Sequence, residues 1–71
     1  MFEEREEKGK KYRLFWEDVN ISHPEGSAGL IYSMADHKEI YRYNAPPGET
    51  KEDVKKKIRG LFEYLKNDGL L

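Results

Sequence analysis

The chain has 71 residues and no cysteine, so we expect one small domain without disulfides, Cys-ligated zinc or iron–sulfur clusters. Charged residues make up 38% and hydrophobic residues 37%, yet the net charge is only −1, which gives no overall field toward DNA, RNA or an anionic membrane. One Trp, five Tyr and three Phe argue against a disordered chain.

The chain carries no sign of a membrane segment or a secretion signal. No apolar run approaches the roughly 20 residues of a membrane span. The acidic start "MFEEREEKGKK" also lacks the basic and apolar regions of a signal peptide. We therefore expect a cytoplasmic protein without membrane contact.

The first eight residues have three interpretations. A hairpin turning at Lys8 and Gly9 would place acids opposite bases and join one aromatic pair. The pairs would be Glu7–Lys10, Glu6–Lys11, Glu4–Arg13 and Phe2–Phe15. A helix would instead form the i,i+4 pairs Glu4–Lys8 and Glu7–Lys11, and a frayed terminus is the third alternative. We favour the strand.

The next segment, "KKYRLFWEDVNI", predicts a strand over residues 10–21. Its alternation puts Tyr12, Leu14 and Trp16 on one face. The following "SHPEGSAG" has the Pro, Gly and Ser typical of a solvent loop.

A second hairpin is predicted in "AGLIYSMADHKEIYRYN", with a turn at Asp36 and His37. A loop of two or four residues would pair Tyr32 with Tyr41. It would also pair Leu30 with Tyr43. A three-residue loop would pair Tyr32 with Ile40 instead. The register, and the face of the hairpin that is buried, stay open at this point.

A helix is predicted from about Lys51 to Asn67, after a turn in "APPGE". Thr50 can cap it, with Asp53 as the acid of a capping box. At about 100° per residue, the apolar residues fall on one stripe. They are Val54, Ile58, Leu61, Phe62 and Leu65. Gly69 suits the end of the helix, where Leu70 would fold back onto Leu65 in a Schellman motif.

Strands followed by a helix predict an α+β domain spanning residues 1–71. We expect a three- or four-stranded antiparallel β-meander, packed on one face by the C-terminal helix. Residues 1–8 would form an extra edge strand or fray.

The basic residues of the helix suggest one candidate site, a nucleic-acid contact. Phosphates could meet Lys55, Arg59 and Lys66 on one helix flank, with Arg42 among strand tyrosines that could stack on bases. The same helix offers three i,i+4 ion pairs, which favour a solvated face instead. They are Glu52–Lys56, Asp53–Lys57 and Arg59–Glu63.

A protein-contact site is the other candidate. Gly60 faces away from the apolar stripe, where a glycine costs helix stability. Beside Tyr64 it makes a small notch into which a second chain could pack. Tyr41 and Tyr43 on the predicted strand could extend this contact through an aromatic surface.

No residue pattern indicates a catalytic or cofactor site. His23 and His37 lie in turns without the spacing of metal ligands, and no serine stands in a nucleophile elbow. We therefore expect no metal, no cofactor and no enzyme activity. The sequence favours a small interaction or regulatory module that binds another protein, including a second copy as a homodimer. The alternative is a nucleic-acid-binding protein.

Overall fold

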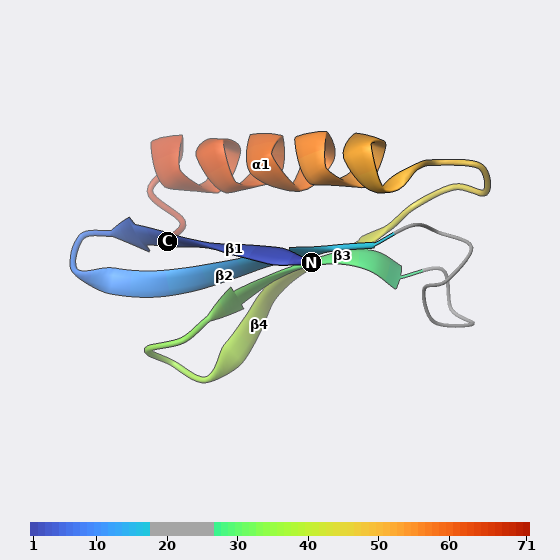
Figure 1. Ribbon diagram of the computed structural model, residues 1–71. Coiled ribbons are helices and arrows are strands. Elements are labelled where there is room, and N and C mark those ends of the chain that lie inside the picture. Colours follow the sequence, from blue (N-terminus) through green and yellow to red (C-terminus); the bar gives the residue numbers. More distant parts are fainter. Residues whose placement is uncertain (18–26) are drawn as a thin grey trace.

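The computed structural model describes residues 1–17 and 27–71, which form one antiparallel sheet and one helix (Figure 1). The strands are β1 (Phe2–Glu7), β2 (Lys10–Trp16), β3 (Ser27–Ser33) and β4 (Lys38–Asn44), and the helix is α1 (Lys51–Asn67). The strands lie side by side in chain order. This confirms the predicted α+β class and gives the meander four strands.

The first hairpin forms as the charge pattern predicts. Lys8 and Gly9 both have positive φ, 52° and 80°, as a tight two-residue hairpin turn requires. All four predicted pairs occur, Glu7–Lys10, Glu6–Lys11, Glu4–Arg13 and Phe2–Phe15. The strand interpretation of residues 1–8 is therefore right, and the helix and the frayed end are wrong.

The second strand buries the face predicted for it. Tyr12, Leu14 and Trp16 lie in the core. The backbone N–H of Glu17 still donates to the carbonyl of Ala28, at 2.9 Å. The segment 27–29 thus belongs to β3 and not to the predicted solvent loop. The rest of that loop, and the predicted end of the preceding strand, lie outside the described residues.

The second hairpin has a register that neither prediction gave. Its turn spans residues 34–37, and Ser33 pairs with Lys38 and Tyr32 with Glu39. A shift at this point then pairs Ile31 with Tyr41. The Ser33 hydroxyl accepts from the backbone N–H of Asp36 and donates to its carboxylate, both at 3.1 Å, which stabilises the turn. Ile40 is the extra residue of the resulting bulge.

The backbone hydrogen bonds at both ends of α1 are those that the sequence predicts. Thr50 and Asp53 form a reciprocal capping box, with hydrogen bonds of 3.2 and 3.1 Å. Gly69 has φ 70°, and its N–H donates to the carbonyl of Lys66, while Leu70 N–H reaches Leu65, which completes a Schellman motif. The side chain of Leu70 is 60% exposed, however, and Leu71 packs against the core in its place.

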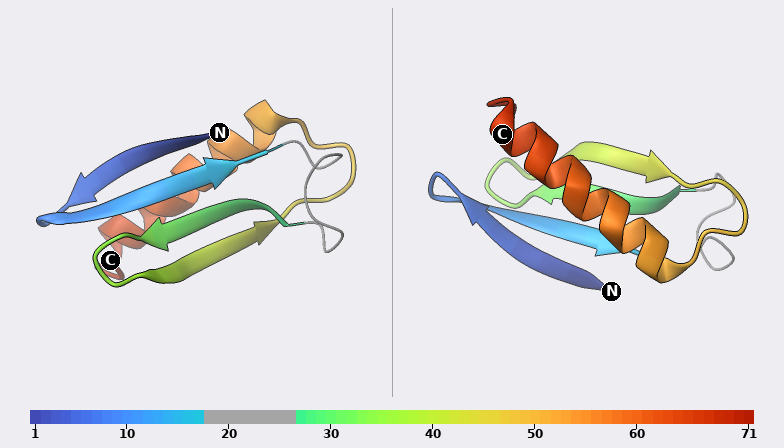
Figure 2. Two further views of the ribbon diagram at one scale, coloured as in Figure 1. Left: turned by 60° about the horizontal axis from the view of Figure 1, so that its bottom comes forward. Right: turned by 90° about the horizontal axis from the view of Figure 1, so that it is seen from above.

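The core lies between α1 and one face of the sheet, across which the helix runs obliquely (Figure 2). Val54, Ile58 and Phe62 are its buried helical residues. Gly29 allows the close approach, since a Cβ there would lie 2.6 Å from Ile58 Cγ1 and Cδ1. In the described part of the chain no second helix or strand covers the other face of the sheet (Figure 1).

Candidate interaction surface

The face of the sheet turned away from α1, here called the open face, carries the candidate site. Strand alternation places on it the neighbours of the buried residues Leu14 and Ile31. Its residues include Phe2, Glu4 and Glu6 in β1, Lys11, Arg13 and Phe15 in β2, Leu30 and Tyr32 in β3, and Glu39 and Arg42 in β4. The left view of Figure 2 looks onto this side, with α1 behind the sheet.

One row of the open face is apolar across three strands. The register places Phe2 beside Phe15, Phe15 beside Leu30 and Leu30 beside Arg42. The rings of Phe2 and Phe15 have their centroids 5.6 Å apart. Phe2 is 52% exposed, while Phe15 and Leu30 are half-buried. Three large apolar side chains thus form a contiguous patch on the solvent side of the sheet.

The charged residues beside the apolar row pair with one another. Arg13 donates to Glu4 at 2.7 Å, and this hydrogen bond is the main cause that lowers the pKa of Glu4. The Arg13 guanidinium also lies over the Phe2 ring, 4.6 Å from its centroid, and its buried Nε has no hydrogen-bond partner. Arg42 donates to Glu39 at 2.6 Å. Each of these arginines therefore already holds a carboxylate.

The other side of β1 is joined to the helix by ion pairs. Arg59 donates to Glu3 at 2.7 and 2.9 Å, and Arg5 donates to the same carboxylate at 2.8 Å. Burial raises the pKa of Glu3, but the hydrogen bonds from Arg59 and Arg5 together lower it by more. The pKa of Glu3 therefore lies below its ordinary value. Arg5 also reaches Glu63 on the helix, at 3.6 Å.

The structure separates the four cations predicted to contact nucleic acid. Arg42 lies on the open face, while the other three lie in the helix layer. Lys55 pairs with Glu52 at 3.1 Å and lies over Trp16, Arg59 holds Glu3, and Lys66 lies between Glu7 and Glu63. The structure thus places Arg42 apart from the three helical cations, and each of the four has a carboxylate partner.

The ion pairs of the helix also differ from the i,i+4 pairs that we predicted. Asp53 takes part in the helix cap, and Lys57 reaches Glu49 at 3.4 Å instead. Glu52 pairs at i,i+3, and Arg59 reaches across to β1. Tertiary partners lie within reach of these side chains, so they replace the local ones.

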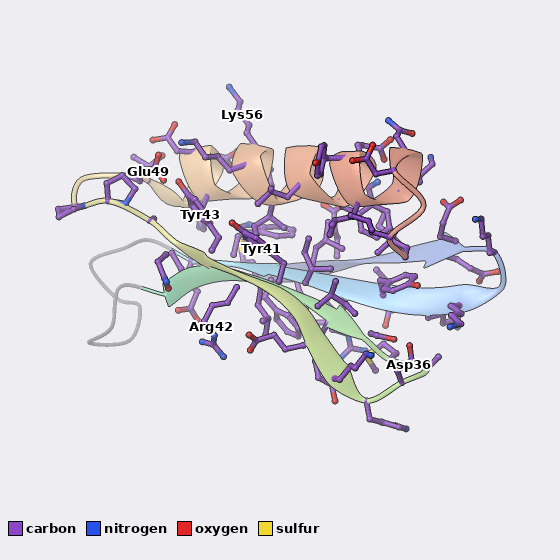
Figure 3. All side chains as sticks on the ribbon, turned by 180° about the vertical axis from the view of Figure 1, so that it is seen from behind. Asp36, Tyr41, Arg42, Tyr43, Glu49 and Lys56 are labelled. Atoms are coloured by element: carbon purple, nitrogen blue, oxygen red, sulfur yellow. The ribbon has the colours of Figure 1, made fainter. Side chains whose placement is uncertain are left out.

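Tyr41 and Tyr43, which were predicted to contact a protein partner, point from β4 toward the helix layer (Figure 3). Arg42, which lies between them in the sequence, points away from the helix layer (Figure 3). Tyr43 donates to Glu49 at 2.7 Å, and Lys57 lies 5.6 Å from its ring centroid. Burial, and then the hydrogen bond to Glu49, raise the pKa of Tyr43. Its hydroxyl thus ties β4 to the segment before the helix.

The helical pair Gly60 and Tyr64 lies on the outer side of α1. A Cβ at Gly60 would have no heavy atom within 4 Å, which agrees with the predicted outward position. Tyr64 is 58% exposed, and Tyr41 is 39% exposed. This side of the helix offers one large exposed aromatic, Tyr64, among charged residues.

The apolar residues of the open face were missed as a site, although the sequence contains their signal. The alternation that buries Tyr12, Leu14 and Trp16 sends Arg13 and Phe15 to the opposite face. We predicted contacts on the tyrosines instead, because tyrosine rings suit base stacking. The half-exposed phenylalanines are the more informative residues.

Other kinds of site find no support in the described part of the chain. Its His, Asp and Glu residues form no group of three or more that could hold a metal ion. No described helix is long and apolar enough to cross a membrane. Comparisons with protein-family models, with curated proteins and with solved structures each gave no match.

Proposed function

We propose that this protein is a non-enzymatic interaction module of the cytoplasm that binds another protein through the open face. The observation that carries the proposal is the apolar row Phe2, Phe15 and Leu30 on the side of the sheet without a helix. A sheet packed on one side ordinarily presents polar side chains to water on the other. A contiguous apolar patch bounded by charged residues is typical of a protein interface.

The charges around the patch favour a protein partner over a nucleic acid. Arg13 and Arg42 each hold a glutamate, at 2.7 and 2.6 Å, so phosphates would compete with carboxylates already in place. A protein surface of mixed charge can meet both signs at once. The net charge of −1 adds no long-range attraction toward a polyanion.

The small core is a second support for a partner. In this 71-residue chain, the described residues form one helix and one sheet, and their core lies on one side of that sheet. Domains of this size have marginal stability on their own. A protein that covers the open face would add burial that the chain itself lacks and would stabilise the fold by mass action.

Photo-crosslinking in the organism that makes the protein tests this function. A photoreactive phenylalanine analogue replaces Phe2 on the open face, and a matched variant carries it at Tyr64 on the outer side of α1. Both positions are exposed aromatics of similar accessibility, so they differ mainly in the surface that they sample. Mass spectrometry then identifies the adducts.

The proposal expects protein adducts at position 2 that are weaker or absent at position 64. Nucleic acid as the main adduct at position 2 would overturn it in favour of the rival function, for which the aromatic rings and guanidiniums on one face would serve as a stacking platform. Equal adducts at both positions, or none at position 2, would also contradict it.

A further inference from the structure

We infer that the protein which binds the open face is a second copy of this chain, packed sheet on sheet about a two-fold axis that runs parallel to the strands between β2 and β3. This inference rests on the proposed function and specifies its partner. It follows from how the side chains of the open face match their own symmetry mates.

The axis determines which strands meet. Because the sheet order is β1-β2-β3-β4, rotation about a line between the two central strands places β1 over β4 of the second copy. It likewise places β2 over β3. Since the axis runs along the strands, residues of one cross-strand row meet the same row of the other copy. Both copies use the same patch, as an isologous dimer requires.

The apolar row is complementary to itself under this operation. Phe15 meets Leu30 of the second copy twice, in the centre of the interface. Phe2 meets Arg42 of the second copy twice, at the margins. The first contact buries two apolar side chains, and the second sets a guanidinium against an aromatic ring, a favourable cation–π geometry.

The polar row fits the same arrangement. Arg13 meets Tyr32 of the second copy, so the guanidinium can stack on a ring. Glu4 meets Glu39 of the second copy, the one contact between like charges. Both carboxylates are already held by an arginine of their own chain, and both lie toward the water-exposed margin, where repulsion is screened.

A different two-fold axis explains the face less well. An axis in the plane of the sheet but perpendicular to the strands would stack each strand on its own symmetry mate. It would place Glu4 of the acidic β1 near the same strand of the second copy, without a basic strand opposite. Like charges facing each other across an interface are unfavourable, so the axis parallel to the strands is preferred.

The available area predicts a weak dimer. Four strands about 4.8 Å apart and seven residues at about 3.4 Å each give a projected face of roughly 450 Å². Stable interfaces bury about 800 Å² per partner, which is more than this projected face. Because stacked sheets cross at about 30°, the central Phe15–Leu30 contacts are the closest. We therefore expect a dissociation constant in the micromolar range.

Sedimentation equilibrium over a wide concentration range tests the dimer. The wild-type chain should pass from monomer to dimer as its concentration rises. Leu30→Lys should weaken this association more than about tenfold, because each interface carries the change twice. Tyr64→Ser, the matched control on the helix, should leave it unchanged. Circular dichroism verifies that each variant is folded.

Cysteine cross-linking tests which strands of the two copies face each other, in variants whose substitutions lie outside the core. The chain has no cysteine, so each introduced thiol is unique. A mixture of the F2C and R42C variants, treated with a short bismaleimide, should give mostly the mixed product. F2C alone should react poorly, because three strand spacings, about 14 Å laterally, separate its two copies across the axis.

The outcomes separate this inference from the proposed function. A monomer at every concentration, or equal cross-linking in all mixtures, would overturn the dimer. If photo-crosslinking at position 2 then yields a different protein, the interaction function stands with another partner. If sedimentation shows a dimer and photo-crosslinking at position 2 yields the chain itself, both the dimer and the interaction function stand.

Discussion

The two faces of this sheet are built from the same strands, yet they differ in what covers them. Leu14 and Ile31 face α1 and are fully buried, whereas their neighbours Phe15 and Leu30 face the other way and remain half-exposed. Strand alternation alone assigns these residues to opposite sides. The comparison teaches that one strand can place core residues on one face and leave apolar side chains partly exposed on the other.

The largest expected difference between the faces comes from the same substitution made on each. Leu14→Ala should lower the free energy of unfolding by about 2–5 kcal/mol, because it leaves a cavity beneath α1. Leu30→Ala, on the neighbouring strand, should cost about 1 kcal/mol or less, since the half-exposed site leaves no enclosed cavity. Urea unfolding at low protein concentration measures both, and equal losses would contradict the comparison.

A glycine tests how closely the helix lies on the covered face. The Cβ of Gly29→Ala would come within 2.6 Å of Ile58 and 3.2 Å of Val54 side-chain atoms, so the Ile58 side chain or the helix that carries it must shift. We expect a loss of about 1–3 kcal/mol from overpacking. Thermal or urea unfolding reports this value, and a variant as stable as the wild type would show that α1 does not pack so tightly here.

An ion pair at the margin of the covered face should contribute less. Glu3 has a lowered pKa, so its contribution is present above its ordinary value of 4.5 and is lost as the pH falls through the lower folded value. Glu3→Gln should therefore cost about 0.5–1 kcal/mol at neutral pH, because the pair is partly exposed. The difference should shrink on acidification. A cost that is independent of pH would exclude the charge as its cause.

The smallest effect is expected on the outer side of the helix. Gly60→Ala should raise the free energy of unfolding by up to about 1 kcal/mol, because alanine favours the helix and its Cβ would meet open space. Under the sheet-on-sheet dimer, sedimentation should be the same as for the wild type. Loss of association in this variant would show that two copies associate through the outer side of the helix and not through the open face.

Local patterns predicted the elements that depend on local chemistry. The opposed charges around Lys8 and Gly9 gave the first hairpin with its register, and Thr50 and Asp53 gave the start of the helix. In the second hairpin the turn lies at residues 34–37, so Tyr32 pairs with Glu39 and neither predicted Tyr32 pair forms. Beyond the bulge at Ile40, the pairs Ile31–Tyr41 and Leu30–Arg42 follow the register of a three-residue loop, and nothing in the alternation marks this shift. The contact between Arg59 and Glu3 joins residues 56 positions apart, which no local pattern contains.

The candidate surface that we now propose differs from the one predicted from the sequence. An interaction surface was expected, but on tyrosines and on Gly60. One of the two registers left open placed Tyr32 and Tyr41 on one face, while the structure puts them on opposite faces. The chain packs one side of its sheet and leaves Phe2, Phe15 and Leu30 on the other, and this division follows from tertiary packing.

Side-chain NMR spectra recorded during dilution, from millimolar to low-micromolar protein, test most directly whether the open face is the contact surface. The account predicts concentration-dependent shifts of the Phe2 and Phe15 rings and of the Leu30 methyl groups, with the Tyr64 ring and the Leu14 methyl groups unchanged. Shifts centred on Tyr64, or spectra that do not change with concentration, would contradict self-association through the open face.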